Sequence, residues 1–283
     1  MTRVRPIIRQ FGSKGRVADQ ILSFVPPGKQ IWCELFAGTA SVTLAKAPHH
    51  EEHLNDLNGD IVCLFRLLRD PEARARLVEA VALTPWSEAE YHACRAEPYT
   101  GDAIEDARRY LVRAWQGING DSAKGTSWAS FDGSSKARPK IWDDLPLRIA
   151  AVARRLKGVS IHQKPAIELL QRVARYPQAV VFADPPYPLH SIDGQRSTYS
   201  VDMNEAEHRA FAGALREAGC SVILTMNPGT IYSEILADWH VHEVRVQGLG
   251  NKRKAELILT NFDPMAVGLF HGVACSSSYG LCE

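Results

Sequence analysis

The sequence predicts an α/β fold in which a mainly parallel sheet is interrupted by a mainly helical insert. The first third alternates short apolar runs with helical spacing and a small-residue turn, which is typical of a nucleotide-binding half. Residues 179–183 are all apolar, as expected of a parallel strand buried on both faces. Residues 70–156 show helical patterns only. We therefore predict an α/β domain of residues 1–68 and 157–263, an insert of residues 69–156 and a peripheral or disordered tail of residues 264–283.

The expected elements follow from apolar spacing, strand length and the positions of Pro and Gly. In the first third they are a helix at 17–25, a strand at 30–33, a helix at 39–46 and a helix at 61–68. In the insert they are helices at 71–82, 87–96, 104–116 and 144–156, interrupted by a polar stretch at 119–140. In the last third they are strands at 159–162, 179–183, 221–226, 241–246 and 256–260, and helices at 203–217 and 231–236. The last two strands are close enough along the chain to pair antiparallel at a sheet edge.

Composition excludes several classes of protein. The chain has 283 residues, of which 45% are hydrophobic and 23% charged, which is typical of a soluble globular protein. It contains no run of about 18 apolar residues, and its start lacks the apolar segment of a secretory signal. The six cysteines include no C-x-x-C pair, so we expect reduced thiols in a cytoplasmic protein, with no metal site.

Charge is unevenly distributed along a nearly neutral chain. Residues 51–106 hold 13 acidic and five basic side chains, whereas residues 107–142 hold seven basic and two acidic ones. Separate basic surfaces are what a polyanion requires. Three tryptophans fall in or beside the basic segment, which fits either base stacking with phosphate contact or a small helical subdomain with a tryptophan core. The candidate nucleic-acid contacts are Arg108, Arg109, Arg113, Asn119, Lys124, Lys136, Arg138 and Lys140.

The tetrapeptide Asp184-Pro185-Pro186-Tyr187 directly follows the apolar strand 179–183. It could simply end the strand, because Pro-Pro stops strands. Its composition also suits methylation of an exocyclic amine, whose lone pair is delocalised into an aromatic ring. The Asp184 carboxylate and the Pro185 carbonyl can accept both N–H protons, so that the lone pair points at an incoming methyl group. The Tyr187 ring can stack on the base, and the carboxyl end of a parallel strand is where open α/β sheets bind ligands.

A methyl donor site is expected in the first third of the chain. The segment Glu34-Leu35-Phe36-Ala37-Gly38 follows a strand and opens a helix, as an adenosine-binding turn must. It lacks the G-x-G-x-x-G spacing that a dinucleotide cofactor needs, which argues against an oxidoreductase. Asp56 lies about 20 residues on, at the next strand end, where it can accept both ribose hydroxyls. The sequence thus predicts an S-adenosylmethionine pocket in a Rossmann-like sheet.

Several motifs in order resemble the Dam-type N6-adenine DNA methyltransferases in the α motif order, close to their bacteriophage branch. The resemblance covers about residues 6–263. Its motifs here are Gln10-Phe11-Gly12-Ser13-Lys14, Glu34 to Val42, Asn55-Asp56-Leu57-Asn58, Ile161 to Leu170, Asp184 to Tyr187, Leu224-Thr225-Met226-Asn227-Pro228 and Arg253-Lys254-Ala255-Glu256-Leu257. Residues 106–119 resemble the target-recognition insert of that branch. The ordered set is specific, whereas any single motif other than Asp-Pro-Pro-Tyr is not.

The resemblance implies roles for individual residues. It places Lys14 and Asp56 on the cofactor and Asp184 between cofactor and target amine. Gln10 stands where the family often has Trp, and Ala166 replaces an acidic residue beside the cofactor's adenine, while Ile167 can keep the apolar contact. The expected cofactor-binding residues are Gln10, Lys14, Glu34, Phe36, Ala37, Gly38, Asp56, Ile167 and Asp184.

The predicted activity is site-specific methylation of adenine N6 in double-stranded DNA. The adenine would be flipped out and stacked on Tyr187, with Tyr199 as a residue that could close over it. The expected catalytic segment is Asp184, Pro185, Pro186 and Tyr187. An N4-cytosine DNA methyltransferase and a catalytically silent DNA-binding homologue stay open as alternatives. We further expect a monomer in the cytoplasm of a bacterial or phage-infected cell, with a role in restriction-modification among the possibilities.

Overall fold

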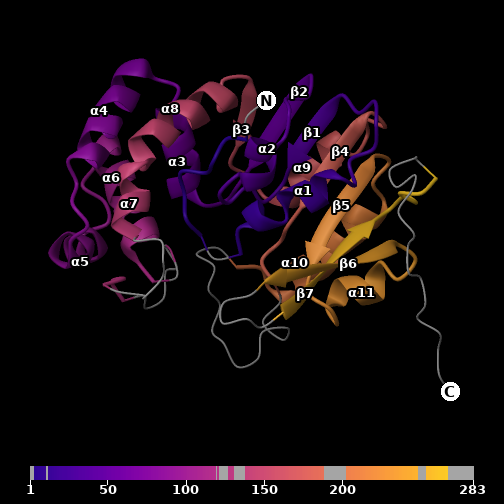
Figure 1. Ribbon diagram of the computed structural model, residues 1–283. Helices are drawn as coiled ribbons and strands as arrows, with labels where there is room; N and C mark the ends of the chain where they lie inside the picture. The colour runs from indigo at the N-terminus through magenta and orange to yellow at the C-terminus, as the bar shows by residue number, and fades with distance from the viewer. Residues whose placement is uncertain are drawn as a thin grey trace.

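The computed structural model describes residues 3–10, 12–118, 120, 127–130, 138–187, 202–247 and 253–266 (Figure 1). Four of the candidate contacts lie outside these described residues: Asn119, Lys124, Lys136 and Tyr199. Residues 267–283 of the predicted tail also lie outside them.

Seven strands form one mixed sheet in the order β3-β2-β1-β4-β5-β7-β6. They are β1 (Ile31–Glu34), β2 (Glu51–Asn55), β3 (Val159–His162), β4 (Ala179–Ala183), β5 (Ser221–Met226), β6 (His240–Gln247) and β7 (Arg253–Thr260). The first five in spatial order are parallel, and β7 is antiparallel to both β5 and β6. The predicted Rossmann-like α/β class is therefore confirmed, as is the antiparallel pairing of the last two strands.

The helices of the described chain are η1 (Lys14–Arg16), α1 (Ala18–Leu22), α2 (Ser41–Ala45), α3 (Gly59–Leu67), α4 (Pro71–Ala82), α5 (Glu88–Ala96), α6 (Ala103–Gln116), α7 (Arg138–Asp143), α8 (Leu145–Leu156), α9 (Ala166–Val173), α10 (Glu205–Arg216) and α11 (Ile231–Ile235). Polar side chains set several of their starts. Asp70 and Asp102 accept backbone N–H groups at α4 and α6, and Asn204 forms a capping box with Glu207 at α10. Three of these helices, η1, α7 and α9, have no counterpart among the elements predicted from the sequence. The two-turn helix α9 buries its apolar face at the i, i+3, i+4 and i+7 positions.

Helices α4 to α8 gather beside α3 and β3, on the side of the molecule away from β6 and β7 (Figure 1). One apolar core runs from this helical group to the sheet and the N-terminal segment. Trp115 and Trp142 are buried in this core. The Trp115 indole N–H donates to the carbonyl of Ile7 at 2.7 Å, and the Trp142 indole to that of Thr84 at 2.8 Å. For these two tryptophans, the structure supports the core interpretation over base stacking.

The parallel strands direct their carboxyl ends to one edge of the sheet. Glu34 ends β1, Asn55 ends β2, Ala183 ends β4 and Met226 ends β5. The motifs identified in the sequence follow these strand ends directly, so the topology brings them together although they are up to about 190 residues apart. The site lies at this edge.

Two further features bear on the predicted protein class. Within the described ranges, no helix is long and apolar enough to cross a membrane. Cys33, Cys63, Cys94 and Cys220 are free thiols, and three of these four are buried.

Candidate active site and cofactor pocket

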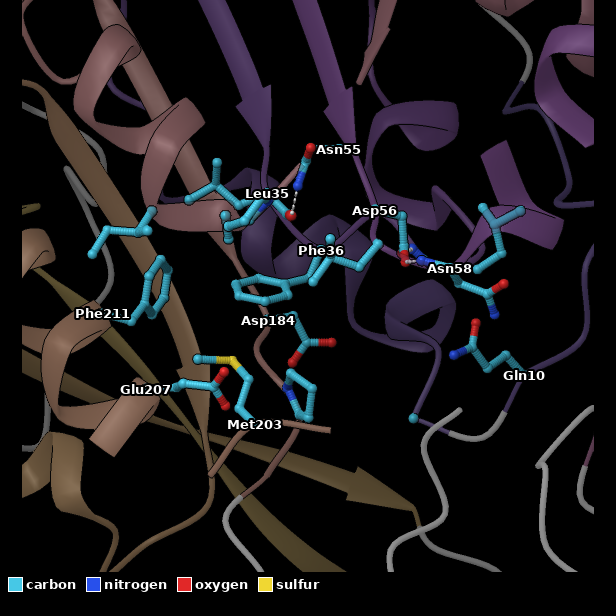
Figure 2. A pocket seen from close by; sticks show the side chains of 18 of the residues that line it. Gln10, Leu35, Phe36, Asn55, Asp56, Asn58, Asp184, Met203, Glu207 and Phe211 are labelled. Carbon is cyan, nitrogen blue, oxygen red and sulfur yellow. Dashed lines mark hydrogen bonds between the residues drawn. The ribbon is translucent and has the colours of Figure 1, made fainter. Parts of the chain in front are cut away.

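Loops at the carboxyl edge of the sheet enclose a cavity of about 270 Å³ (Figure 2). The loops after β1, β2 and β4 contribute to its wall, together with the N-terminal segment and the starts of α3, α9 and α10. The lining includes Gln10, Phe36, Gly38, Asp56, Asn58, Ala166, Ile167, Asp184, Met203, Glu207 and Phe211.

Asp56 forms the polar wall of the cavity. Its Oδ2 accepts the backbone N–H of Gly38 at 2.7 Å, and its Oδ1 accepts that of Asn58 at 2.8 Å. Burial raises the pKa of this carboxyl, and the backbone N–H groups oppose that rise. Because each carboxylate oxygen has a second lone pair, Asp56 can still accept two hydroxyl groups. Asp56 thus fits the pair of ribose hydroxyls predicted for it.

The opposite wall of the cavity is apolar. Figure 2 shows Phe36 and Phe211 facing each other, with Met203 nearby. The two rings meet edge to face, with centroids 5.3 Å apart. Ala166 and Ile167 extend the wall at the start of α9. Such a wall suits an aromatic base. The residue at position 166 offers no hydrogen bond, as the sequence predicted.

Gln10 presents an unused hydrogen-bond acceptor to this cavity. Its Oε1 is buried and has no hydrogen-bond partner among the described residues. Gly38 lies beside it with φ +48°, and a Cβ atom at Gly38 would approach that oxygen to 3.2 Å. Any other residue at position 38 would therefore be strained and crowded. An orphaned acceptor at Gln10, a carboxylate with lone pairs left for two hydroxyl groups at Asp56 and an apolar wall together fit S-adenosylmethionine.

Asp184 is the first residue of the predicted catalytic segment. It lines the cavity, and its Oδ1 accepts the Thr225 hydroxyl at 2.7 Å and the Lys14 ammonium at 2.8 Å. Burial raises the pKa of Asp184. Nearby Glu256 raises it further, while Lys14 and Thr225 lower it. Thr225 holds the carboxylate from β5, the strand next to β4.

Tyr187 is anchored by its hydroxyl group. The Tyr187 side chain is 9% exposed, and its hydroxyl donates to Glu256 while accepting from Lys14 Nζ at 3.0 Å. Lys14 also pairs with Glu256 at 2.8 Å. Burial raises the pKa of Tyr187 well above its ordinary value, so the phenol is the neutral form. Asp184, Tyr187, Lys14 and Glu256 thus form one connected group, called the buried quartet below.

Six of the nine predicted cofactor residues line the cavity and three do not. Gln10, Phe36, Gly38, Asp56, Ile167 and Asp184 line it. Lys14 supports Asp184 from outside the lining. Ala37 does not line it either, and its backbone N–H donates to the backbone carbonyl of Asn55 at 2.8 Å.

Glu34 also lies outside the lining and faces α2. Its Oε2 accepts both the backbone N–H (3.1 Å) and the hydroxyl of Thr43. Burial raises the pKa of Glu34 to about 8. The side chain therefore fixes the turn between β1 and α2, and does not face the cavity.

Three of the predicted nucleic-acid contacts are held by carboxylates of the protein itself. Arg108 pairs with Glu105 at 2.6 Å and with Glu90 at 2.7 Å. Arg109 pairs with the same Glu105 at 2.7 Å, and Arg113 pairs with Asp60 at 3.2 Å. The hydrogen bonds from Arg108 lower the pKa of Glu105 to about 2. These ion pairs explain the three arginines without any nucleic acid.

Arg138 and Lys140 lie on the short helix α7, and Lys140 is exposed. Of the predicted contacts within the described residues, Lys140 is thus the one whose cation faces solvent.

Sequence reasoning missed several residues of the site. Thr225 and Glu256 lay in recognised motifs, but no role was assigned to them. Met203, just before α10, and Glu207 and Phe211, on the first two turns of α10, line the cavity. The apolar spacing of that helix was visible in the sequence, yet nothing in it showed which end would reach the site.

Comparison with known proteins agrees with this geometry. The sequence model of the D12 class N6 adenine-specific DNA methyltransferases matches residues 11–247. This match spans most of the chain, and the protein belongs to this family. S-adenosylmethionine is accordingly its cofactor. A search of curated proteins found no match.

Two solved structures are similar to this chain at low sequence identity. One is a SAM-dependent methyltransferase from Agrobacterium tumefaciens, with 10% identity and a TM-score of 0.36 over 87% of this chain and 60% of that one. The other is the rRNA methyltransferase aviRa from Streptomyces viridochromogenes, with 13% identity and a TM-score of 0.38 over 93% of this chain and 92% of that one. This chain therefore spans about three fifths of the first structure, and the family match is what identifies the protein.

Proposed function

We propose that this protein transfers the methyl group of S-adenosylmethionine to N6 of adenine in double-stranded DNA. The observation that carries the proposal is the position of Asp184. One carboxylate both lines the cavity that fits the cofactor and begins the Asp-Pro-Pro-Tyr segment at the end of β4. Donor and acceptor can therefore meet at a single side chain.

The residues around Asp184 perform the chemistry mainly by positioning. Bound S-adenosylmethionine supplies the electrophilic methyl group. The Asp184 carboxylate and the Pro185 carbonyl accept the two amine N–H groups, which turns the nitrogen lone pair toward the cavity. Thr225 and Lys14 fix the carboxylate. Asp56 and the apolar wall would hold the cofactor in the same cavity that Asp184 lines. After transfer the methylated nitrogen is cationic and therefore loses its extra proton readily. No metal is needed to activate the amine.

The target adenine must leave the duplex to reach this buried carboxylate, at a cost of a few kcal/mol. We assign the Tyr187 ring as the surface on which it stacks. The anchored hydroxyl supports that role, because its hydrogen bonds hold the far end of the ring in place. Helices α4 to α8 form the target-recognition insert in this proposal, residues 69–156, with the catalytic domain on either side of it in sequence.

The surface that grips DNA is assigned to Lys140 and Arg138 on α7, together with the polar segment that follows α6. The exposed ammonium of Lys140, within the insert, would neutralise a phosphate and make affinity depend on salt. The bacteriophage branch, a restriction-modification role, a monomeric state and a cytoplasmic location stay predictions from the sequence.

Methyl transfer to unmethylated duplex DNA tests the proposed function. Tritiated S-adenosylmethionine is the donor, and the digested DNA is separated into nucleosides. Labelled N6-methyladenine is expected, and it should be absent with Asp184→Ala. Labelled N4-methylcytosine would keep the mechanism but change the base. No label, from protein shown to bind cofactor and DNA, would favour a silent DNA-binding homologue.

A further inference from the structure

Glu256 is the member of the buried quartet for which the proposed chemistry has no use. It lies on β7, a strand antiparallel to β5 and far in sequence from the Asp-Pro-Pro-Tyr segment. Its side chain is 13% exposed, and its Oε1 accepts from both Lys14 and Tyr187. Burying a carboxylate is costly unless it is paired and hydrogen-bonded, and Lys14 and Tyr187 are the groups that do so for Glu256.

The quartet holds two carboxylates and a single ammonium. Lys14 Nζ is 2.8 Å from Asp184 Oδ1 and 2.8 Å from Glu256 Oε1, and the lysine side chain is 6% exposed. An ammonium paired with Asp184 alone would draw on the lone pairs that the target amine requires. Because Glu256 shares the ammonium, Asp184 keeps a stronger acceptor for an N–H group.

The same carboxylate also fixes the aromatic ring. The Tyr187 hydroxyl donates to Glu256, and Lys14 Nζ lies 5.1 Å from the centre of the Tyr187 ring. Glu256 Oε1 thus contacts the Lys14 ammonium, which holds Asp184 at the start of the Asp-Pro-Pro-Tyr segment, and the hydroxyl of Tyr187 at its end.

We propose that Glu256 is a positioning residue for methyl transfer, which shares the Lys14 ammonium with Asp184 and anchors the Tyr187 ring. This inference rests on the proposed function. Glu256 touches neither cofactor nor target in this scheme, and acts through Lys14 and Tyr187.

The charged and titratable groups around Asp184 come from several elements. Lys14 approaches from η1, Glu256 from β7 and Tyr187 from its own segment, while Glu34 of β1 acts at longer range. Thr225 of β5 donates a neutral hydrogen bond. Asp184 must be ionised to accept the amine, so activity falls as the pH drops through its pKa. The negative charge of Glu256 raises that pKa. Removing the charge must therefore move the acid limb, the fall of kcat at low pH, to lower pH.

The test compares kcat across a pH series for wild type, Glu256→Gln and the control Glu217→Gln, with cofactor and DNA saturating. Glu217 is exposed at the end of α10, so its substitution changes net charge by the same amount away from the quartet. Glu256→Gln should lower kcat by about tenfold, less than the loss from a direct hydrogen-bonding group. Its acid limb should move to lower pH while KM for S-adenosylmethionine stays unchanged. Glu217→Gln should match wild type.

Two more variants keep the test decisive. Thr225→Val removes the hydroxyl that stabilises ionised Asp184, so its acid limb should move to higher pH, opposite to that of Glu256→Gln. Glu256→Asp keeps the charge but withdraws it from Tyr187, so kcat should fall while the acid limb stays near wild type. This second variant decides the matter if Glu256→Gln does not fold.

The inference would be overturned if both Glu256 variants kept the kcat of wild type and the same acid limb. An unmoved limb in Thr225→Val would do the same, because the limb would then not belong to Asp184. Either result leaves the proposed function intact as long as wild type forms N6-methyladenine. Absence of that product from wild type would instead refute the proposed function.

Discussion

The carboxyl edge of the sheet and the helical insert use polar residues in opposite ways. At the edge, Gln10 leaves an acceptor unsatisfied toward the cavity, and Asp56 keeps lone pairs available. In the insert, Arg108, Arg109 and Arg113 are paired with carboxylates. The edge keeps hydrogen-bonding capacity for ligands, whereas these three arginines of the insert are paired within the fold.

This difference corrects the interpretation of charge along the sequence. Counted along the sequence, the acidic block 51–106 and the basic block 107–142 leave a separate basic surface open, beside the ordinary interpretation as solvated charge clusters. In the structure the two blocks meet, because Glu105 and Glu90 contact Arg108 while Asp60 contacts Arg113. A run of positive residues therefore marks a nucleic-acid surface only if its partners elsewhere in the chain are known.

The strongest test of the edge is Asp184→Asn. The amide keeps the size of the side chain but replaces one acceptor oxygen by a donor, so kcat should fall by about 10²–10³-fold. Tritiated methyl transfer measures the loss, and a thermal melt shows whether the fold is kept. Activity within tenfold of wild type would mean that Asp184 does not hold the amine.

A second test separates structural from ligand-facing acids at this edge. Burial raises the pKa of Glu34 from 4.5 to about 8. The contribution of Glu34 to the free energy of unfolding is therefore fully present below pH 4.5 and is lost as the pH rises through about 8. Glu34→Gln should abolish this fall in the free energy of unfolding with rising pH, which is on the order of 2–4 kcal/mol in wild type. Urea unfolding at pH 5.0 and pH 8.5 gives the comparison, and an equal pH response in both proteins would show that Glu34 ionises normally.

Asp56→Ala sharpens the assignment of the cofactor pocket. The change removes the acceptor for the ribose hydroxyls and for two backbone N–H groups, so affinity should drop by about 10–100-fold. Calorimetric titration with S-adenosylmethionine measures it. Asp60→Ala is a matched control, since Asp60 lies outside the cavity lining. Equal affinities for the two variants would place the ribose elsewhere.

The smallest effect concerns the insert. Lys140→Gln should reduce the salt dependence of DNA binding by about 0.9 in the slope of log K against log salt, the amount for one phosphate contact. Arg109→Gln removes the same charge from an arginine held by Glu105 and Glu97, and should leave the slope unchanged. A reduced slope for Arg109→Gln would show that its ion pairs open on DNA and would break the comparison.

The sequence by itself determined the fold class, most of the described elements to within three residues, and the chemistry of the Asp-Pro-Pro-Tyr segment. These features depend on local spacing and on residue type, which a sequence displays directly. The grouping of Asp56 and Asp184 around one cavity was also predictable, because parallel strands place their carboxyl ends at the same edge.

Only the tertiary structure decided which partners those residues take. Glu256 reaches Lys14 and Tyr187 because β7 is inserted antiparallel beside β5, and no local pattern specifies that pairing. Glu34 turns to Thr43, although its motif suggested the cofactor. Arg108 meets Glu90 across two packed helices. Hydrogen bonds and ion pairs act over about 3 Å in space, and residues at that distance can be far apart along the chain.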